Sequence, residues 1–197
     1  MSSPSLTPPG DLTARARIRN EAFSLYAIQG EERVSMRAVA AAAGVTIGLV
    51  QHHFGTKEGL RRSVDEYVVE HFVEALAGVE HTGTAAEVVA ARDGAVRTML
   101  QENPLVVRYL LRMLLEPETR GAFVLGQLVD LTVQEIRRLR EAGFASTTTP
   151  EPVQVVRTIL GQIGEHALEP MVGAVWKRVG GSDADRPRTE ITVVQPT

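Results

Sequence analysis

Apolar residues recur every three or four positions along most of the chain, which is the period of an amphipathic helix. The clearest stripe lies within residues 57–79 and consists of Leu60, Val64, Val68, Phe72, Ala75 and Val79. Residues 11–29 repeat the pattern with Ile18, Ala22, Leu25 and Tyr26. Alternating apolar and polar residues, the signature of strands, are scarce. The pattern therefore predicts an all-α protein.

Glycines, prolines and capping residues divide this pattern into about nine helices. Ser35, Thr46 and Thr56 each precede a predicted helix and are suited to cap it. Pro170 lies inside the last helical stretch and is expected to kink or split it. The predicted helices span residues 11–29, 36–43, 47–54, 57–79, 85–101, 104–115, 117–142 and 152–179.

The same signals predict a division of the chain into four parts. Residues 1–10 are rich in serine and proline and are expected to form a flexible arm. Residues 11–56 form a small domain of three helices, and residues 57–180 form a larger helical domain. Residues 181–197 follow two glycines, are mostly polar, and are expected to form a flexible tail.

Composition narrows the location and the chemistry. The chain has no cysteine, so disulfides and thiolate metal sites are excluded. No apolar run is long enough to span a membrane and no secretory signal is visible, so we expect a cytoplasmic protein. The net charge is −3, yet residues 11–62 hold eight basic and five acidic residues. This asymmetry favours an anionic partner for the N-terminal part.

Residues 35–57, SMRAVAAAAGVTIGLVQHHFGTK, have the pattern of a helix-turn-helix. Ala40 is small enough for two helices to cross closely, and Gly44 accepts the left-handed backbone of the turn. No acidic residue occurs in this stretch, and DNA phosphates would repel one. The predicted outer face of the third helix, which would read bases in the major groove, consists of Ile47, Gly48, Leu49, Gln51 and His52.

The first 60 residues resemble the DNA-binding domain of the TetR family of transcriptional regulators. The resemblance rests on Phe23, on the run S-x-R-x-V-A-x-x-A-G-V-T from Ser35 to Thr46, and on the ending H-F-x-x-K-E-x-L from His53 to Leu60. The rest of the chain is similar only in the number and length of its helices. One departure is that Ile47 and Gln51 stand where the family commonly has a basic residue and a tyrosine.

The resemblance implies a homodimer that binds double-stranded DNA and answers to an unknown small-molecule effector. It implies that the last two long helices form the dimer interface. The apolar faces expected there consist of Leu128, Leu131, Ile136, Val155, Ile159 and Ile163. Ligand-gated repression of a palindromic operator is the preferred interpretation. The positions that contact phosphates in the family correspond to Ser35, Arg37, Thr46, His53 and Lys57.

Polar residues interrupt the apolar helices of the second domain, where they either face solvent or line a ligand cavity. The predicted cavity residues are Met99, Tyr109, Met113, Phe123, Gln127, Gln162, His166 and Trp176.

Three alternatives to ligand-gated repression remain open: a transcriptional activator, a regulator gated by a protein partner, and an all-helical enzyme with a vestigial helix-turn-helix. No catalytic motif supports the enzyme, and no cofactor is expected. His52 and His53 do not form a metal site, because adjacent helical residues point about 100° apart.

Overall fold

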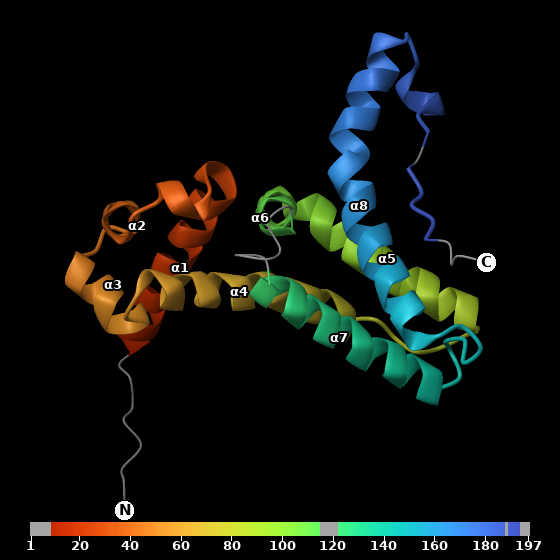
Figure 1. Ribbon diagram of the computed structural model, residues 1–197, viewed down its shortest axis with the longest axis horizontal. Coiled ribbons are helices and arrows are strands. Elements are labelled where there is room, and N and C mark those ends of the chain that lie inside the picture. Colours follow the sequence, from red (N-terminus) through yellow and green to blue (C-terminus); the bar gives the residue numbers. More distant parts are fainter. Residues whose placement is uncertain (1–8, 115–121, 188, 194–197) are drawn as a thin grey trace, which may run out of the picture.

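The structure, a computed structural model, describes residues 9–114, 122–187 and 189–193. Within these ranges the chain forms eight α-helices and two short 3₁₀ helices, η1 (Glu31–Arg33) and η3 (Asp183–Asp185), and no strand. Figure 1 shows α1, α2 and α3 at one end of the molecule and the later helices at the other, with α4 reaching from one group to the other. The all-α prediction is confirmed.

The N-terminal domain consists of α1 (Pro9–Gln29), α2 (Met36–Ala42) and α3 (Ile47–Phe54). The predicted inner face of α1 is buried at Ile18, Ala22 and Tyr26. Val39 on α2 and Val50 on α3 pack against it and are completely buried. These apolar contacts fix the orientation of α3 relative to α1 and α2.

The second domain consists of α4 (Lys57–Ala77), α5 (Ala85–Glu102), α6 (Pro104–Leu114), α7 (Ala122–Glu141) and α8 (Glu151–Arg178). Helices α4, α5, α7 and α8 pack around one another, whereas α6 lies across α1. Thr84 and Glu87 form a capping box at the start of α5, each bonding the other's backbone nitrogen.

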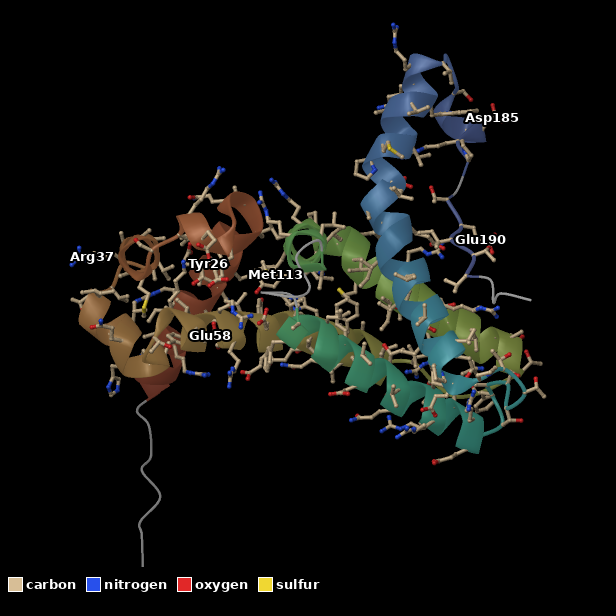
Figure 2. The ribbon with its side chains drawn as sticks, viewed as in Figure 1. Tyr26, Arg37, Glu58, Met113, Asp185 and Glu190 are labelled. Carbon is tan, nitrogen blue, oxygen red and sulfur yellow. The ribbon has the colours of Figure 1, made fainter. Side chains whose placement is uncertain are left out.

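One hydrophobic core runs through both domains. It continues from the N-terminal helices along the buried stripe of α4 into α6 and α7. Figure 2 places Met113 of α6 between the two groups of helices, and this side chain is buried in the same core. The domains are therefore joined by packing as well as by the chain.

Several predicted boundaries differ from the observed ones. Helix α1 begins at Pro9 instead of residue 11, while the predicted arm at residues 1–8 lies outside the described residues. Residues 115–121, where one predicted helix ends and the next begins, also lie outside them. Pro170 was expected to kink or split the last helix, and because α8 runs unbroken through it, the split is wrong. The missing proline N–H removes one backbone bond of a 28-residue helix, which the remaining bonds tolerate.

The helix faces predicted to form the dimer interface point inward instead. Leu128, Ile136 and Val155 are buried within the monomer, and Leu131, Ile159 and Ile163 line a cavity inside it. The physical reason is that α4 and α5 cover these faces of α7 and α8. No helix in the described ranges is both long enough and apolar enough to cross a bilayer.

Candidate nucleic-acid interface and internal cavity

Side-chain caps at the N-termini of α2, α3 and α4 position helix α3. Thr46 Oγ1 accepts a hydrogen bond from the Leu49 backbone nitrogen at 3.3 Å. Ser35 Oγ caps α2 through Ala38, and Thr56 Oγ1 caps α4 through Gly59, both at 3.1 Å. The three predicted caps are thus confirmed, and they satisfy backbone donors that would otherwise be free at each helix start.

The predicted base-reading residues divide into two groups. Gly48, Gln51 and His52 are exposed on α3, whereas Ile47 and Leu49 are half-buried and pack against the core. Gln51 carries both a donor and an acceptor, the pair that reads the adenine edge in the major groove. The exposed face is short, uncharged and free of acidic side chains.

The predicted phosphate-contacting residues surround this face. Ser35 and Thr46 lie exposed at the starts of α2 and α3, and each hydroxyl keeps its own proton for a further acceptor while its oxygen serves as the cap. Arg37 lies at the outer edge of α2, as Figure 2 shows. Lys57 and His53 are half-buried near the α3–α4 turn. The set therefore combines hydroxyl donors with basic side chains, the groups that bind phosphate oxygens.

Two glycines shape the turns around α3. Gly44 has a φ of +63° in the α2–α3 turn, as predicted. Gly59, in the first turn of α4, lies so close to α3 that a Cβ there would collide with the carbonyl oxygen of Phe54. The missing side chain at Gly59 thus allows α4 to start directly against the end of α3.

A buried polar network joins the two domains. The Tyr109 hydroxyl of α6 donates to Asp65 Oδ1 at 2.5 Å, and Arg61 Nη1 donates to Asp65 Oδ2 at 2.7 Å. Arg61 also pairs with Glu58 and lies 4.0 Å from Glu31 of η1. Tyr109 and Asp65 are both completely buried.

Burial dominates the electrostatics of this network. Desolvation raises the pKa of Asp65 to about 6, although the hydrogen bond from Tyr109 and the charge of Arg61 act in the opposite direction. Desolvation also raises the pKa of Glu31 and of Tyr109. At neutral pH the tyrosine is therefore a donor and the aspartate an ionised acceptor.

Arg112 of α6 makes a second connection to the N-terminal domain. Its Nε donates to the carbonyl of Ala27 at 3.1 Å and its Nη2 to the carbonyl of Ile28 at 2.9 Å. These carbonyls belong to the last turn of α1, where backbone acceptors lack helical partners. Sequence reasoning missed this role because Arg112 and α1 are more than eighty positions apart.

A cavity of about 330 Å³ lies between α4, α5, α7 and α8. Its wall is mainly apolar and includes Phe72, Leu131 and Ile159, with Phe144 from the α7–α8 connection. Arg92, only 5% exposed, also lines it and is ion-paired with Glu135. A second hollow of about 240 Å³ between α5 and α8 shares Asp93, Arg157 and Gln162 with it.

The structure separates the eight predicted cavity residues. Gln162 lines the cavity, and His166 lies beside it in the second hollow. Tyr109 and Met113 are buried in the core that joins α6 to the N-terminal domain. Their grouping in one cavity wall was therefore wrong, because α6 turns this face toward α1 and α4.

The other four predicted cavity residues also lie elsewhere. Met99 lines a separate hollow beside His71, and Phe123 lies under the Arg62 guanidinium at 5.2 Å. Trp176 Nε1 donates to the Ser182 carbonyl at 2.7 Å near the end of α8. Gln127 is half-buried on α7 and is absent from the cavity wall. Apolar periodicity alone did not reveal which neighbour each helix face meets.

Comparison with known proteins connects this geometry to a family. Residues 18–64 match the family described as bacterial regulatory proteins, tetR family. Over 60 residues the chain is 53% identical to the HTH-type transcriptional regulatory protein RaaS of Mycobacterium tuberculosis. That match covers 30% of this chain and 28% of RaaS, so the chain matches less than a third of this relative's length.

Solved structures extend the likeness to the whole fold. A TetR transcriptional regulator from Chloroflexus aurantiacus aligns with a TM-score of 0.70 at 20% identity, covering 84% of this chain and 88% of that one. A putative tetR family regulator from Shewanella aligns with a TM-score of 0.68 at 19% identity, covering 84% and 90%. At these identities the alignments show a shared fold.

Proposed function

Because the chain belongs to the TetR family of bacterial regulatory proteins, we propose that it regulates transcription in the cytoplasm as a homodimeric, ligand-responsive repressor. The observation that carries the DNA-binding part is the uncharged face of α3, where Gly48, Gln51 and His52 are exposed. Capping hydroxyls at Ser35 and Thr46 and the cation of Arg37 flank this face. This arrangement suits a helix lying in the major groove between two phosphate backbones.

Two-fold symmetry follows from the size of the reading helix. Helix α3 has eight residues and reaches only a few base pairs, so specific recognition needs two copies on a palindromic operator. Apolar surface suited to self-association lies on the outer side of α8, where Leu160, Met171 and Val175 are each about half exposed.

The cavity supports a small-molecule effector of low net charge. Its cationic Arg92 is already paired with Glu135, and Asp93 accepts a hydrogen bond from Gln162 at 3.1 Å. The cavity volume falls at the small end of the roughly 300–1,000 Å³ typical of ligand sites. An uncharged, mainly apolar molecule with one or two hydrogen-bonding groups therefore fits better than an anion.

Helix α4 provides the connection between effector and DNA. Phe72 and Leu76 of α4 line the cavity, and the other end of α4 starts against α3 at Lys57. A ligand that pushes on Phe72 would tilt α4 and change the separation of the two α3 helices in the dimer. The ligand must bind one of these states more tightly, with a coupling free energy of about 1–3 kcal/mol.

The test is binding to genomic DNA fragments over a salt series. The double variant Gln51→Ala, His52→Ala should lose a palindromic subset that the unchanged protein retains, and Gln101→Ala, on the exposed side of α5, should retain it. Lys57→Ala should weaken binding to every fragment and reduce the salt slope by about 0.9 per lost phosphate contact. Uniform binding that the double variant leaves unchanged would refute the assignment of α3.

Effector binding is tested with the neutral apolar dye N-phenyl-1-naphthylamine. Its fluorescence should rise on binding and should be lost in Leu131→Trp, which fills the cavity. The matched control is Val73→Trp on the exposed side of α4, where fluorescence should be unchanged. A promoter reporter carrying the recovered operator tests repression, because deletion of the regulator should then raise transcription.

A further inference from the structure

The outer side of α8 carries a row of apolar residues with one gap. The row follows the helical spacing of three and four residues, so its members lie on one side of α8. Gly164 occupies the position in this row between Leu160 and Leu168. The exposed members are between 36% and 69% accessible and comprise Val156, Leu160, Leu168, Met171, Val175 and Val179.

The chain beyond α8 folds back over this helix. Gly180, with a φ of +82°, reverses the chain, and the Gly181 nitrogen donates to the Trp176 carbonyl at 3.0 Å. Arg186 then holds α8 through the carbonyl of Glu169 at 2.9 Å and through its carboxylate at 2.6 Å. Figure 1 shows this segment returning beside α8, and Figure 2 places Asp185 and Glu190 along it.

The end of this segment occupies the gap in the row. A Cβ at Gly164 would collide with Ile191 Cδ1, so Ile191 packs directly on the glycine. Two turns away, Arg157 Nε donates to the carbonyl of Val193 at 3.0 Å. Thr189, Ile191 and Val193 are half-buried while Glu190 and Thr192 are exposed, the alternation of an extended segment with one face on a surface.

Residues 189–193 and a second helix would therefore occupy the same surface of α8. Packed helices have axes about 8–10 Å apart, which leaves no room for an extended segment between them. Ile191 fills the gap that Gly164 leaves in the row, so a second helix lying along the row would meet this side chain. We propose that residues 189–193 compete with a second copy of this chain for the outer face of α8, so that this segment must be released when the homodimer forms.

This proposal rests on the homodimer proposed above and adds a control on its stability. Each protomer loses its contacts with Ile191 and the Val193 carbonyl when the segment is released, and the dimer releases two segments. Weakening the contact of Ile191 with α8 should therefore lower the dimer dissociation constant roughly tenfold. This factor follows from the loss of one half-buried apolar contact in each protomer. A segment that bridged the two protomers would have the opposite effect.

Sedimentation of the full chain over a dilution series measures the dimer dissociation constant. Ile191→Ser should lower it roughly tenfold, and Gly164→Ala should lower it too, because the added methyl expels Ile191 and extends the apolar row. Thr192→Ala, which changes an exposed neighbour, should leave it unchanged. An equal dissociation constant in all four proteins, or a weaker dimer in Ile191→Ser, would overturn the competition.

A spin label reports the release directly. Because the chain has no cysteine, Glu190→Cys supplies a single labelling site on the segment without touching its contact face. The nitroxide should be immobile in dilute monomer and mobile in concentrated dimer, while a label at Gln101→Cys should not change. A label that stays immobile in the dimer refutes the competition but leaves the homodimer standing. A chain that remains monomeric at every concentration in all variants refutes the homodimer as well.

Discussion

Tyr109 and Tyr26 are both completely buried, yet removal of their hydroxyl groups should have opposite effects on stability. The Tyr109 hydroxyl donates to the carboxylate of Asp65 at 2.5 Å. The Tyr26 hydroxyl has no hydrogen-bond partner among the described residues. Phenylalanine preserves the ring and its packing, so each substitution isolates one hydroxyl.

The magnitudes follow from these contacts. A hydrogen bond to a charged group contributes about 1.5–3 kcal/mol, and its loss would leave a buried carboxylate with one donor fewer, so Tyr109→Phe should cost about 2 kcal/mol. For a chain of this length that loss lowers the Tm by about 4–8 °C. Tyr26→Phe removes an unpaired buried polar group and should stabilise the protein by about 1 kcal/mol.

Denaturant and thermal unfolding at one fixed protein concentration measure both changes, since a dimer's Tm depends on concentration. The cost of Tyr109→Phe should shrink at pH 5, where Asp65, with its pKa raised to about 6, is mostly protonated and its bond to Tyr109 is no longer charge-assisted. Equal destabilisation by the two variants, or a cost of Tyr109→Phe below about 0.5 kcal/mol at pH 7.5, would refute this account of the network.

Three further perturbations test the structure elsewhere. Folding raises the pKa of Asp65, so the folded state binds its proton more tightly than the unfolded state between about pH 4 and 6, and stability should fall as pH rises through that window. Asp65→Asn should remove this part of the slope in urea titrations. Gly59→Ala should displace α3 from α4 and abolish DNA binding, whereas Gly48→Ala, whose nearest neighbour would be 3.9 Å away, should keep the fold in circular dichroism. Arg112→Met should cost about 1–2 kcal/mol in thermal unfolding by removing both bonds to α1, and an unchanged Tm would contradict the contact.

The N-terminal domain could be predicted from the sequence because its signals are local. Ser35 and Thr46 lie three residues from the backbone groups that they cap, and Gly44 defines its own turn. Each of these residues acts on backbone groups only a few positions away, so its effect can be read from a short stretch of sequence. The buried face of α1 followed for the same reason.

The cavity and the interdomain network could not be predicted in this way. Asp65 and Tyr109 are 44 positions apart, and neither residue type indicates the other. Apolar spacing identifies a buried face but not the helix that covers it, so Tyr109 was assigned to the cavity and Ile159 to a dimer interface, although each faces a different neighbour. Such pairings depend on how whole helices pack.

The continuous core has a consequence for how such regulators can be recombined. Tyr109 and Leu110 of α6 are buried among the side chains of the N-terminal helices, so residues 11–56 do not carry their own complete interior. A chimera that exchanged only this segment for the corresponding one of a relative would leave α6 facing unmatched partners. A DNA-binding domain taken from a relative must therefore keep the contacts made here by Ala27, Asp65 and Tyr109. Compensating substitutions in such a chimera belong at the interface with α6.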